Sequence, residues 1–560
     1  MQEIELKFLV PESRLKGLIR QAQVKSSQVT QLAAHYYDTP DQQLAKADIG
    51  LRIRKEGDTW VQTIKAGGDG IAARLEHNTV LDNEQVQTML DNNTLIPDLS
   101  IYKETAIAPA LEGFKLKKLA KTLTPMYVTD VQRTTRLLVE KDSEGTENSI
   151  ELAYDHGEIV HGNDDTQRDA IQEIEFELVS GDLDFLFKTA KTWCKRYKLC
   201  LSTVTKAERG GLLIKNQSYS PAVSADLSQL IVNKKISMPA FVRTAVHNCL
   251  LQILPNSSAI VAGSTDDEHI LQLHIGISRL RAAIEAFASF SDEINPDWQQ
   301  ILKQTATLLS DYRELTYLAN YIEPELQEHG APAIDWTIDV DALKIEPIDV
   351  VRANDFQLTL LELIAFTMSD PNLEPQADTL AIDKISKILS KQHKKLLKVD
   401  KKLEGANHAE FDSADIEIAD LEGSDIESID LENADLEGVD IQSSDLESSD
   451  SESSDEAQQV QHKLRHHLKE LCYISEFAAP LFSKKEVDKE TKRWLKRLIK
   501  AQTAWEHYYN HVQYQQRYQL KSLSDANALY GAGWFAATLE EDHTHAEKRL
   551  VKFRDSSTFW

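Results

Sequence analysis

Short segments within the first 210 residues alternate charged side chains with apolar ones. In the first segment, Glu3, Glu5 and Lys7 are separated by Ile4 and Leu6. Side chains of one parity share a face of a β-strand, so the charged groups are expected on one face and the apolar groups on the other. Comparable alternation is found in segments 51–54, 62–65 and 173–178. Acids and bases are therefore arranged together, strand after strand.

Charges of both signs on neighbouring strands could do phosphate chemistry. Carboxylates supply hard oxygen ligands for Mg²⁺ or Mn²⁺, while Arg and Lys neutralise phosphate oxygens and stabilise charge in a transition state. One interpretation of the alternation is a sheet with one solvated face. Such a face is usually rich in Thr, Ser, Gln and Lys, whereas Glu, Arg and Lys repeat here. The pattern therefore favours a closed barrel whose charged face lines a tunnel and whose apolar face lies under covering helices.

The charged motifs resemble those of the CYTH superfamily, the triphosphate tunnel metalloenzymes. The segment Glu3-Ile4-Glu5-Leu6-Lys7 matches the ExExK signature of that superfamily. The supporting motifs follow in chain order: Tyr37-Asp38-Thr39, Leu51-Arg52-Ile53-Arg54, Thr63-Ile64-Lys65, Arg74-Leu75-Glu76, Arg133, Tyr154-Asp155-His156-Gly157, Glu173-Ile174-Glu175 and Thr205-Lys206. Together they span residues 1 to about 210.

The resemblance implies an eight-stranded antiparallel β-barrel, open at both ends, over residues 1–210. By the family pattern, the acids that would hold the metals are Glu3, Glu5, Asp155, Glu173 and Glu175. The bases that would bind the triphosphate are Lys7, Arg52, Arg54, Lys65, Arg74, Arg133 and Lys206. Lys7 would also take part in catalysis, with Glu5 or Glu175 as the candidate general base. Arg136 is a second candidate near Arg133, and roles for Glu76 and Glu177 stay open.

After about residue 225 the pattern changes from strand-like alternation to apolar residues spaced three and four apart, which predicts helices. The predicted helical segments are 266–288, 296–322, 355–369, 380–403, 458–482 and 487–521. The boundary between the two patterns lies near residues 216–221. We therefore predict a multidomain chain in which an all-α bundle over residues 226–560 follows the barrel.

Two segments of the helical part resemble the signature helices of a CHAD domain, a helical module often fused behind CYTH. They are 268–281 and a second copy that begins at His462 and runs to Tyr473. The resemblance implies a basic groove that binds polyphosphate, although Leu271 stands where the family has His, and His274, Ser278 and Cys472 stand where it usually has Arg. The remaining candidates for polyphosphate binding are Arg279, Arg281, Arg313, His462, Arg465 and Lys469. The alternative is that the arginines pair with acids inside the bundle.

The net charge of −28 argues against a polyanionic ligand, but the charge is unevenly distributed. Segment 410–456 holds 19 acids and no Lys or Arg, in a five-residue period. One apolar residue per period buries too little surface to offset chain ordering, so we predict a disordered acidic insert at 405–457, with a pentapeptide-repeat β-solenoid as the alternative. The insert would either compete within the molecule for a basic groove or merely lengthen a loop.

Cellular location and partner class follow from what the sequence lacks. The four cysteines form no CxxC pair, which predicts reduced, mostly buried thiols without a disulfide framework or zinc site. No apolar run approaches the ~20 residues of a membrane-spanning helix, and the N-terminus lacks the pattern of a signal peptide. We predict a cytoplasmic protein without a nucleic-acid or membrane partner.

The residues and the resemblance together predict a Mg²⁺- or Mn²⁺-dependent inorganic triphosphatase that converts tripolyphosphate to pyrophosphate and phosphate. Thiamine triphosphatase and nucleoside triphosphatase activities would use the same tunnel, since none of the candidate residues chooses an organic moiety. An adenylyl cyclase is disfavoured because the arrangement of CYTH before CHAD resembles the bacterial triphosphatases. A polyphosphate-binding protein with little turnover is the other alternative, but paired carboxylates in a phosphate site are unfavourable unless metals bridge them.

Overall fold

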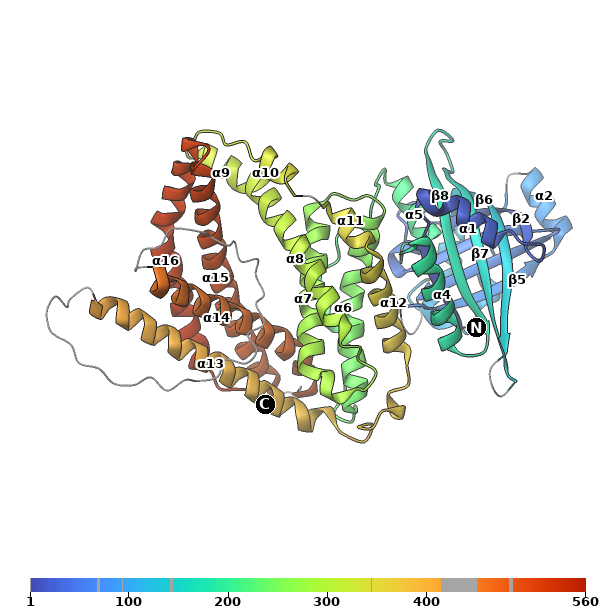
Figure 1. Cartoon of the computed structure of the whole chain (residues 1–560). Coiled ribbons are helices and arrows are strands. Elements are labelled where there is room, and N and C mark those ends of the chain that lie inside the picture. The colour runs from blue at the N-terminus through green and yellow to red at the C-terminus, as the bar shows by residue number, and fades with distance from the viewer. Residues whose placement is uncertain are drawn as a thin grey trace.

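The computed structural model describes residues 2–67, 71–92, 94–141, 145–343, 345–413, 451–482 and 487–560. A β-barrel forms one end of the molecule, and a large helical part forms the other (Figure 1). The centre of the predicted acidic insert, residues 414–450, lies outside the described residues. In the described ranges, no helix is both long enough and apolar enough to cross a membrane.

Eight antiparallel strands close into the barrel in the order β5–β4–β3–β2–β6–β7–β8–β1, with β1 pairing back onto β5. Their bounds are β1 (Gln2–Leu9), β2 (Gln28–Asp38), β3 (Ile49–Glu56), β4 (Thr59–Gly67), β5 (Ala73–Leu81), β6 (Thr124–Lys141), β7 (Glu147–His161) and β8 (Arg168–Ser180). A short strand of two residues, β9 (Cys200–Leu201), pairs with the end of β1. The predicted eight-stranded antiparallel barrel is confirmed.

Helices cover the outer, apolar face of the barrel, as predicted. On one side Phe8 and Phe176 pack edge to face at 5.7 Å, and Phe176 packs in turn on Trp193 of a covering helix. Both phenylalanines are fully buried, and burial of such a ring stabilises the fold by about 1.5–3 kcal/mol. The helices of this half are α1 (Glu12–Ala22), α2 (Asn83–Asp91), α3 (Leu116–Thr122), α4 (Leu183–Tyr197) and α5 (Lys206–Ile214).

The last of these helices, α5, fills one end of the barrel. Inward-facing apolar residues of β2, β6, β7 and β8 form a buried cluster there, against which Ala207, Leu213 and Ile214 of α5 pack. Tyr127 donates a hydrogen bond to the carbonyl of Ala207 at 2.8 Å, and a Cβ on Gly210 would lie 2.1 Å from the Tyr127 ring. The resemblance implied a barrel open at both ends, whereas this end is closed because apolar side chains replace charged ones on the inner face.

The second half of the chain is all-α, as predicted. Its helices are α6 (Met238–Val261), α7 (Asp267–Phe287), α8 (Asp297–Tyr317), α9 (Glu323–Glu328), α10 (Thr337–Asp341), α11 (Pro347–Arg352), α12 (Asn354–Met368), α13 (Ala381–Ser413), α14 (Ser451–Ala478), α15 (Val487–Ser522) and α16 (Leu529–Arg554). A core of fully buried side chains such as Phe241, Phe287 and Phe477 holds them together. All four cysteines are free and buried, which confirms the predicted burial of the thiols.

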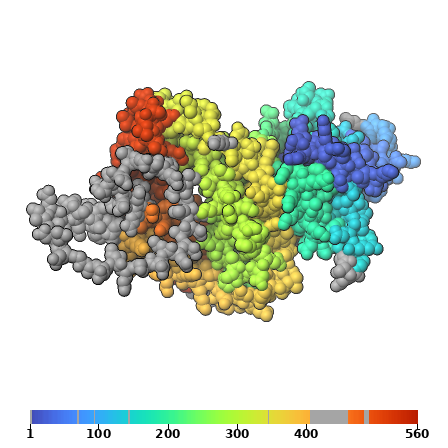
Figure 2. Space-filling view, viewed as in Figure 1, coloured from blue at the N-terminus to red at the C-terminus, as the bar shows by residue number. Residues whose placement is uncertain are grey.

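The barrel and the helices share one apolar core and meet along a continuous surface (Figure 2). The segment around β9 provides the polar contacts: Leu201 N donates to Gln357 Oε1 of α12 at 2.7 Å, and Thr203 N donates to Ser258 Oγ of α6 at 3.0 Å. Gln357 is fixed in turn because its Nε2 donates to Val351 O at 2.7 Å. The helical half is thus in direct contact with the strand and loop that precede α5.

Candidate functional site

The strand register brings the charged residues of β1, β6, β7 and β8 onto the inner face of the barrel. Lys7 lies opposite Glu175, and Asp155 lies opposite both Glu173 and Arg133. Residues paired across antiparallel strands point to the same side of the sheet, so these five groups converge. Asp155 and Glu173 have no exposed surface. Period-two alternation is therefore enough to gather acids and bases inside the barrel.

Lys206 lies at the centre of this group. Thr205 caps α5 by accepting a hydrogen bond from Glu208 N at 3.0 Å, so the helix begins at Lys206. The Lys206 ammonium contacts Asp155 at 2.7 Å, Glu175 at 2.8 Å and Glu173. Although burial opposes it, the pairing with these carboxylates holds the pKa of Lys206 well above its usual value.

Arg133, on β6, binds two of the same carboxylates. Its Nε and one terminal nitrogen donate to the two oxygens of Asp155 at 2.7 and 2.6 Å, and that terminal nitrogen also donates to Glu175 at 2.6 Å. Burial would raise the carboxyl pKa values, but Lys206 and Arg133 together hold the pKa of Asp155 below, and that of Glu175 well below, the usual range. Both acids are therefore ionised at neutral pH.

Three of these carboxylates fit a divalent metal ion. The ligand oxygens of Asp155, Glu173 and Glu175 lie within 4.8 Å of one another. Among the described residues, the buried Glu173 Oε2 accepts no hydrogen bond, and Arg209 Nη1 lies 3.9 Å from it, so this oxygen could still bind a cation. Sets of carboxylate oxygens are the ligands that Mg²⁺ and Mn²⁺ prefer. The Lys206 ammonium lies among the same three groups, so metal and lysine would compete for them.

The remaining acids predicted to bind metal lie apart from these three. Lys65 contacts Glu3 at 2.5 Å and Glu76 at 2.9 Å. Burial and a hydrogen bond to Glu76 raise the pKa of Glu3 to about 8. Burial would also raise the pKa of Glu76, but the hydrogen bond from Glu3 and the charge of Lys65 lower it to about 2. Glu3 is thus the protonated partner of a hydrogen-bonded acid pair. Glu5 lies between Glu3 and Lys7 on the inward face of β1 and lines a cavity described next.

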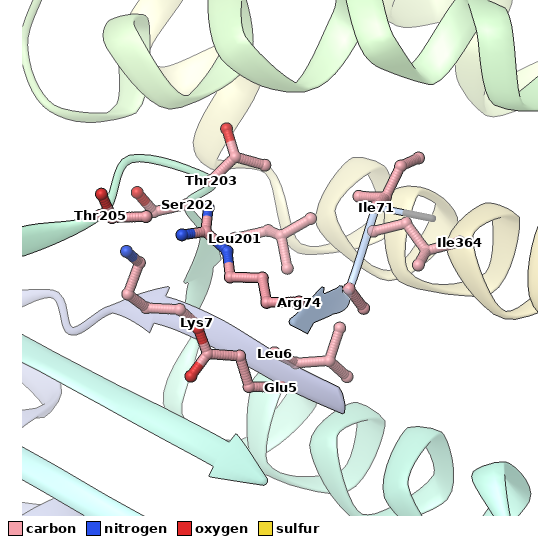
Figure 3. A pocket seen from close by; sticks show the side chains of 11 residues that line it. Glu5, Leu6, Lys7, Ile71, Arg74, Leu201, Ser202, Thr203, Thr205 and Ile364 are labelled. Carbon is pink, nitrogen blue, oxygen red and sulfur yellow. The ribbon is translucent and has the colours of Figure 1, made fainter. Parts of the chain in front are cut away.

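A cavity of about 70 Å³ opens where β1 separates from β5, and Glu5, Lys7 and Arg74 lie on its wall (Figure 3). The loop before α5 forms the opposite wall, where Val204 O accepts a hydrogen bond from Lys7. Burial lowers the pKa of Lys7, although Glu173 opposes this. Ile364 of α12 completes the lining, so the helical half contributes to the charged interior of the barrel.

The two arginines predicted on β3 differ in their partners. Arg52 donates to Tyr36 Oη at 3.2 Å, and its buried Nε has no hydrogen-bond partner among the described residues. Arg54 Nε donates to Glu56 Oε1 at 2.7 Å. An unsatisfied, buried guanidinium nitrogen is unfavourable unless an anion accepts from it. Arg52 is therefore well suited to bind a phosphate oxygen.

The helical half carries a second cationic group, formed by residues of α7, α8 and α14. Arg465 donates to Glu506 at 3.1 Å, and Lys469 lies 4.0 Å from the same carboxylate. Burial, reinforced by Lys469 and Arg313, lowers the pKa of His274 to about 3, so this imidazole stays neutral. Burial also lowers the pKa of Lys469. Two cations, Arg465 and Lys469, thus share one acid.

Comparison with known proteins accounts for both halves. Residues 1–210 match the model of the CYTH domain, and residues 244–519 match that of the CHAD domain. The chain is a CYTH–CHAD protein. The described geometry thus belongs to a CYTH domain that places its acids and bases inside a barrel and to a CHAD domain that packs against it.

Several known proteins are similar to parts of this CYTH–CHAD protein. An inorganic triphosphatase of Haemophilus influenzae is 33% identical over 221 residues, which are 38% of this chain and 55% of that relative. The match thus spans about half the relative's length. The CHAD domain from the plant Ricinus communis is 17% identical and covers 58% of this chain and 96% of its own, with a TM-score of 0.40. PptA from Streptomyces chartreusis is 12% identical, and the match covers 57% of this chain and 96% of PptA, with a TM-score of 0.32.

Within the CHAD domain, the predicted polyphosphate-binding residues do not lie together. Arg313, Arg465 and Lys469 surround His274, and Arg465 lies 4.2 Å over the Tyr509 ring, against which His462 also packs. Arg279, in contrast, is buried and donates to the amides of α6, at 3.0 Å to Gln252 and 2.8 Å to Asn248. Arg281 lies near Glu285 and Glu470, and burial lowers its pKa.

Inside the CYTH domain, the sequence did not indicate Tyr36, which binds Arg52 and stacks on Tyr127 at 4.8 Å. Burial would raise the pKa of Tyr36, but the Arg52 charge lowers it overall. The available signal was its register, because Tyr36 pairs with Arg52 across β2 and β3. Arg136 has the opposite parity to Arg133 and donates to Gln21 O on the outer face at 2.9 Å.

Proposed function

We propose that the CYTH domain is a divalent-metal-dependent inorganic triphosphatase that hydrolyses tripolyphosphate to pyrophosphate and phosphate. The supporting observation is the buried carboxylate group of Asp155, Glu173 and Glu175 inside the same barrel as the predicted phosphate-binding cations. The resemblance to an inorganic triphosphatase over the CYTH domain agrees with this choice of substrate.

The proposed roles follow from placement. The cations assigned to the triphosphate are Lys7, Arg52, Arg54, Lys65, Arg74, Arg133 and Lys206. Asp155, Glu173 and Glu175 would hold Mg²⁺ or Mn²⁺, which when bound polarises a phosphoryl oxygen. Glu3 and Glu5 were also assigned to metal, and this stays a prediction. Positioning and charge neutralisation supply most of the rate in phosphoryl transfer, so loss of one phosphate-binding cation should cost about 2–4 kcal/mol of transition-state stabilisation.

The two candidate general bases are unequal. Glu175 accepts from Lys206 and Arg133, and its pKa lies well below the usual range, so it binds a proton weakly. A general base is most effective when its pKa lies near the working pH. Glu5 lines the cavity beside Lys7 and Arg74, where a substrate oxygen or water could approach it (Figure 3). We therefore assign the base to Glu5.

The test measures phosphate release by the full chain from tripolyphosphate, ATP and thiamine triphosphate with Mg²⁺ or Mn²⁺. Tripolyphosphate is expected to turn over fastest, and ATP turning over faster would overturn the choice of substrate. Glu5→Gln should lower kcat strongly while tripolyphosphate binding persists; Glu12→Gln, on the outer helix α1, is the control. Tight binding of tripolyphosphate by the wild type without turnover would instead support a binding protein.

We also propose that the CHAD domain binds long-chain polyphosphate through the cations that surround His274. Arg313 and Lys469 come from different helices, and both lower the pKa of that imidazole, which places their charges close together. The double variant Arg313→Gln/Lys469→Gln of the full chain should lose retention on polyphosphate at physiological salt. Unchanged retention would remove this role.

The four buried, unpaired cysteines agree with the proposed cytoplasmic location.

A further inference from the structure

Two histidines and an aspartate meet on the CHAD domain, on helices α15 and α16, outside the barrel. His507 and His511 are four residues apart on α15, so their imidazoles share one face of the helix, with ring centroids 4.1 Å apart. Asp542 extends from α16, which packs along α15 (Figure 1). Neither the CYTH chemistry nor the basic group around His274 uses these three residues.

The donor atoms converge on one point. Asp542 Oδ2 lies 2.7 Å from His511 Nδ1, and Asp542 Oδ1 lies 3.5 Å from His507 Nε2. The three ligand atoms lie within 4.8 Å of one another. Donors bound tetrahedrally at about 2.0–2.1 Å from a zinc-type ion are separated by roughly 3.3 Å, so these spacings need only small side-chain rotations to hold one ion.

The surroundings favour a metal over a simple ion pair. Among the described residues, Asp542 forms ion pairs with the two histidines, and no Lys or Arg lies within ion-pair distance of its carboxylate. Phe535 packs edge-on against His511 at 5.1 Å and Thr538 Oγ1 lies 3.5 Å from its Nδ1, so the ring has a defined position.

We propose that His507, His511 and Asp542 form a binding site for a zinc-type divalent ion that links α15 to α16. Two imidazole nitrogens and one carboxylate oxygen select Zn²⁺, Co²⁺, Ni²⁺ or Cu²⁺ over Mg²⁺. His511 and Asp542 are 18% and 16% exposed, whereas His507 is 57% exposed, so the site lies at the surface with room for water as a fourth ligand. It differs in chemistry from the carboxylate-only group in the CYTH barrel.

The test uses the full chain after treatment with a chelator. Excess Mg²⁺ is kept present so that the barrel carboxylates are occupied, and Co²⁺ is titrated while its visible absorption is recorded; Zn²⁺ is then added as a competitor. The wild type should develop the intense absorption of four-coordinate Co²⁺ with one equivalent, and Zn²⁺ should abolish it. His511→Ala and Asp542→Asn should weaken Zn²⁺ binding at least tenfold.

The matched control is His329→Ala, an exposed histidine directly after α9. It should bind Co²⁺ and Zn²⁺ like the wild type. His507→Ala guards against misfolding, because its exposed side chain can be removed without disturbing the core, and it should also weaken Zn²⁺ binding at least tenfold. If His507→Ala and the wild type bind Zn²⁺ equally, the proposal is wrong and the three residues form only a hydrogen-bonded contact between helices.

Discussion

Lys206 is expected to control how the barrel binds metal, and the substitution Lys206→Met tests this. Its side chain is only 10% exposed, and its ammonium contacts Asp155, Glu173 and Glu175. Methionine has a similar length and no charge. In the variant, Asp155 and Glu175 would keep Arg133, whereas Glu173 would have, among the described residues, only Lys7 nearby and Arg209 Nη1 at 3.9 Å.

The magnitude follows from the charge that is lost. A pair of unit charges about 4 Å apart is worth roughly 4 kcal/mol at an effective dielectric constant near 20. Removing one partner of a buried pair costs about 3–5 kcal/mol of folding free energy because the other charge stays buried. A bound divalent cation restores the missing charge, so Mn²⁺ should bind the variant at least tenfold more tightly, about 1.4 kcal/mol, than it binds the wild type.

The assay is thermal or urea unfolding of the full chain over a series of Mn²⁺ concentrations. Without added metal, Lys206→Met should unfold more easily than the wild type, and Mn²⁺ should restore much of the loss while stabilising the wild type less. Lys188→Met is the control, because Lys188 is 69% exposed and its pair with Glu140 contributes about 0–1 kcal/mol.

The stability difference between Lys206→Met and the wild type should also depend on pH. In the wild type, Glu175 has a pKa well below its unfolded value, so it stabilises the fold above the unfolded pKa, and this stability is lost as pH falls through the folded pKa. Without Lys206 that contribution shrinks, so the variant should differ most from the wild type at neutral pH and least in acid. A Mn²⁺ effect no larger in the variant than in the wild type would refute the argument.

Three further predictions concern the barrel and its contact with the CHAD domain. Gly210→Ala should destabilise the chain by about 1–3 kcal/mol in urea unfolding, since its Cβ would overlap the Tyr127 ring, whereas Gly211→Ala, which meets open space, should not. Burial raises the pKa of Glu177 to about 7, so the stability of the wild type falls as pH rises from about 4.5 to 7. Above pH 7, Glu177→Gln should therefore be more stable relative to the wild type than it is in acid, and equal pH profiles of unfolding would contradict this. Gln357→Leu removes the partners of two buried backbone groups, Leu201 N and Val351 O, and should lower the free energy of unfolding by about 2 kcal/mol or more. Thermal unfolding measures this, and an unchanged stability would show that the contact is dispensable.

The CHAD domain reaches the CYTH chemistry through one short segment. Residues 199–205 contact α6 and α12 on one side, while the same segment supplies the carbonyl that binds Lys7 and leads into Lys206 on the other. Ile364 lines the cavity that holds Glu5 and Arg74. The position of two charged barrel residues therefore depends on helices whose contacting residues lie 55 and 156 positions later in the chain.

Local periodicity in the sequence determined which residues face inward. A strand alternates every second residue, so Glu173 and Glu175 had to share a face, as did Arg52 and Arg54, once those segments formed strands. Spacings of three and four likewise determined the helical half. Free, buried cysteines followed from the absence of paired motifs. Each of these properties depends on neighbours within a few residues, which is why the sequence alone was sufficient.

Only the tertiary structure decided how far along the barrel each inward residue lies. The register of β1 places Glu3 opposite Arg74, away from Asp155, and so separates acids that the family pattern had grouped. Closure of one barrel end by α5 and burial of Arg279 against the amides of α6 likewise arise between elements distant in sequence. Alternation predicts the face on which a side chain lies, but not its position along the barrel axis or the residues it contacts. Register and packing decide these, and both depend on contacts across the whole fold.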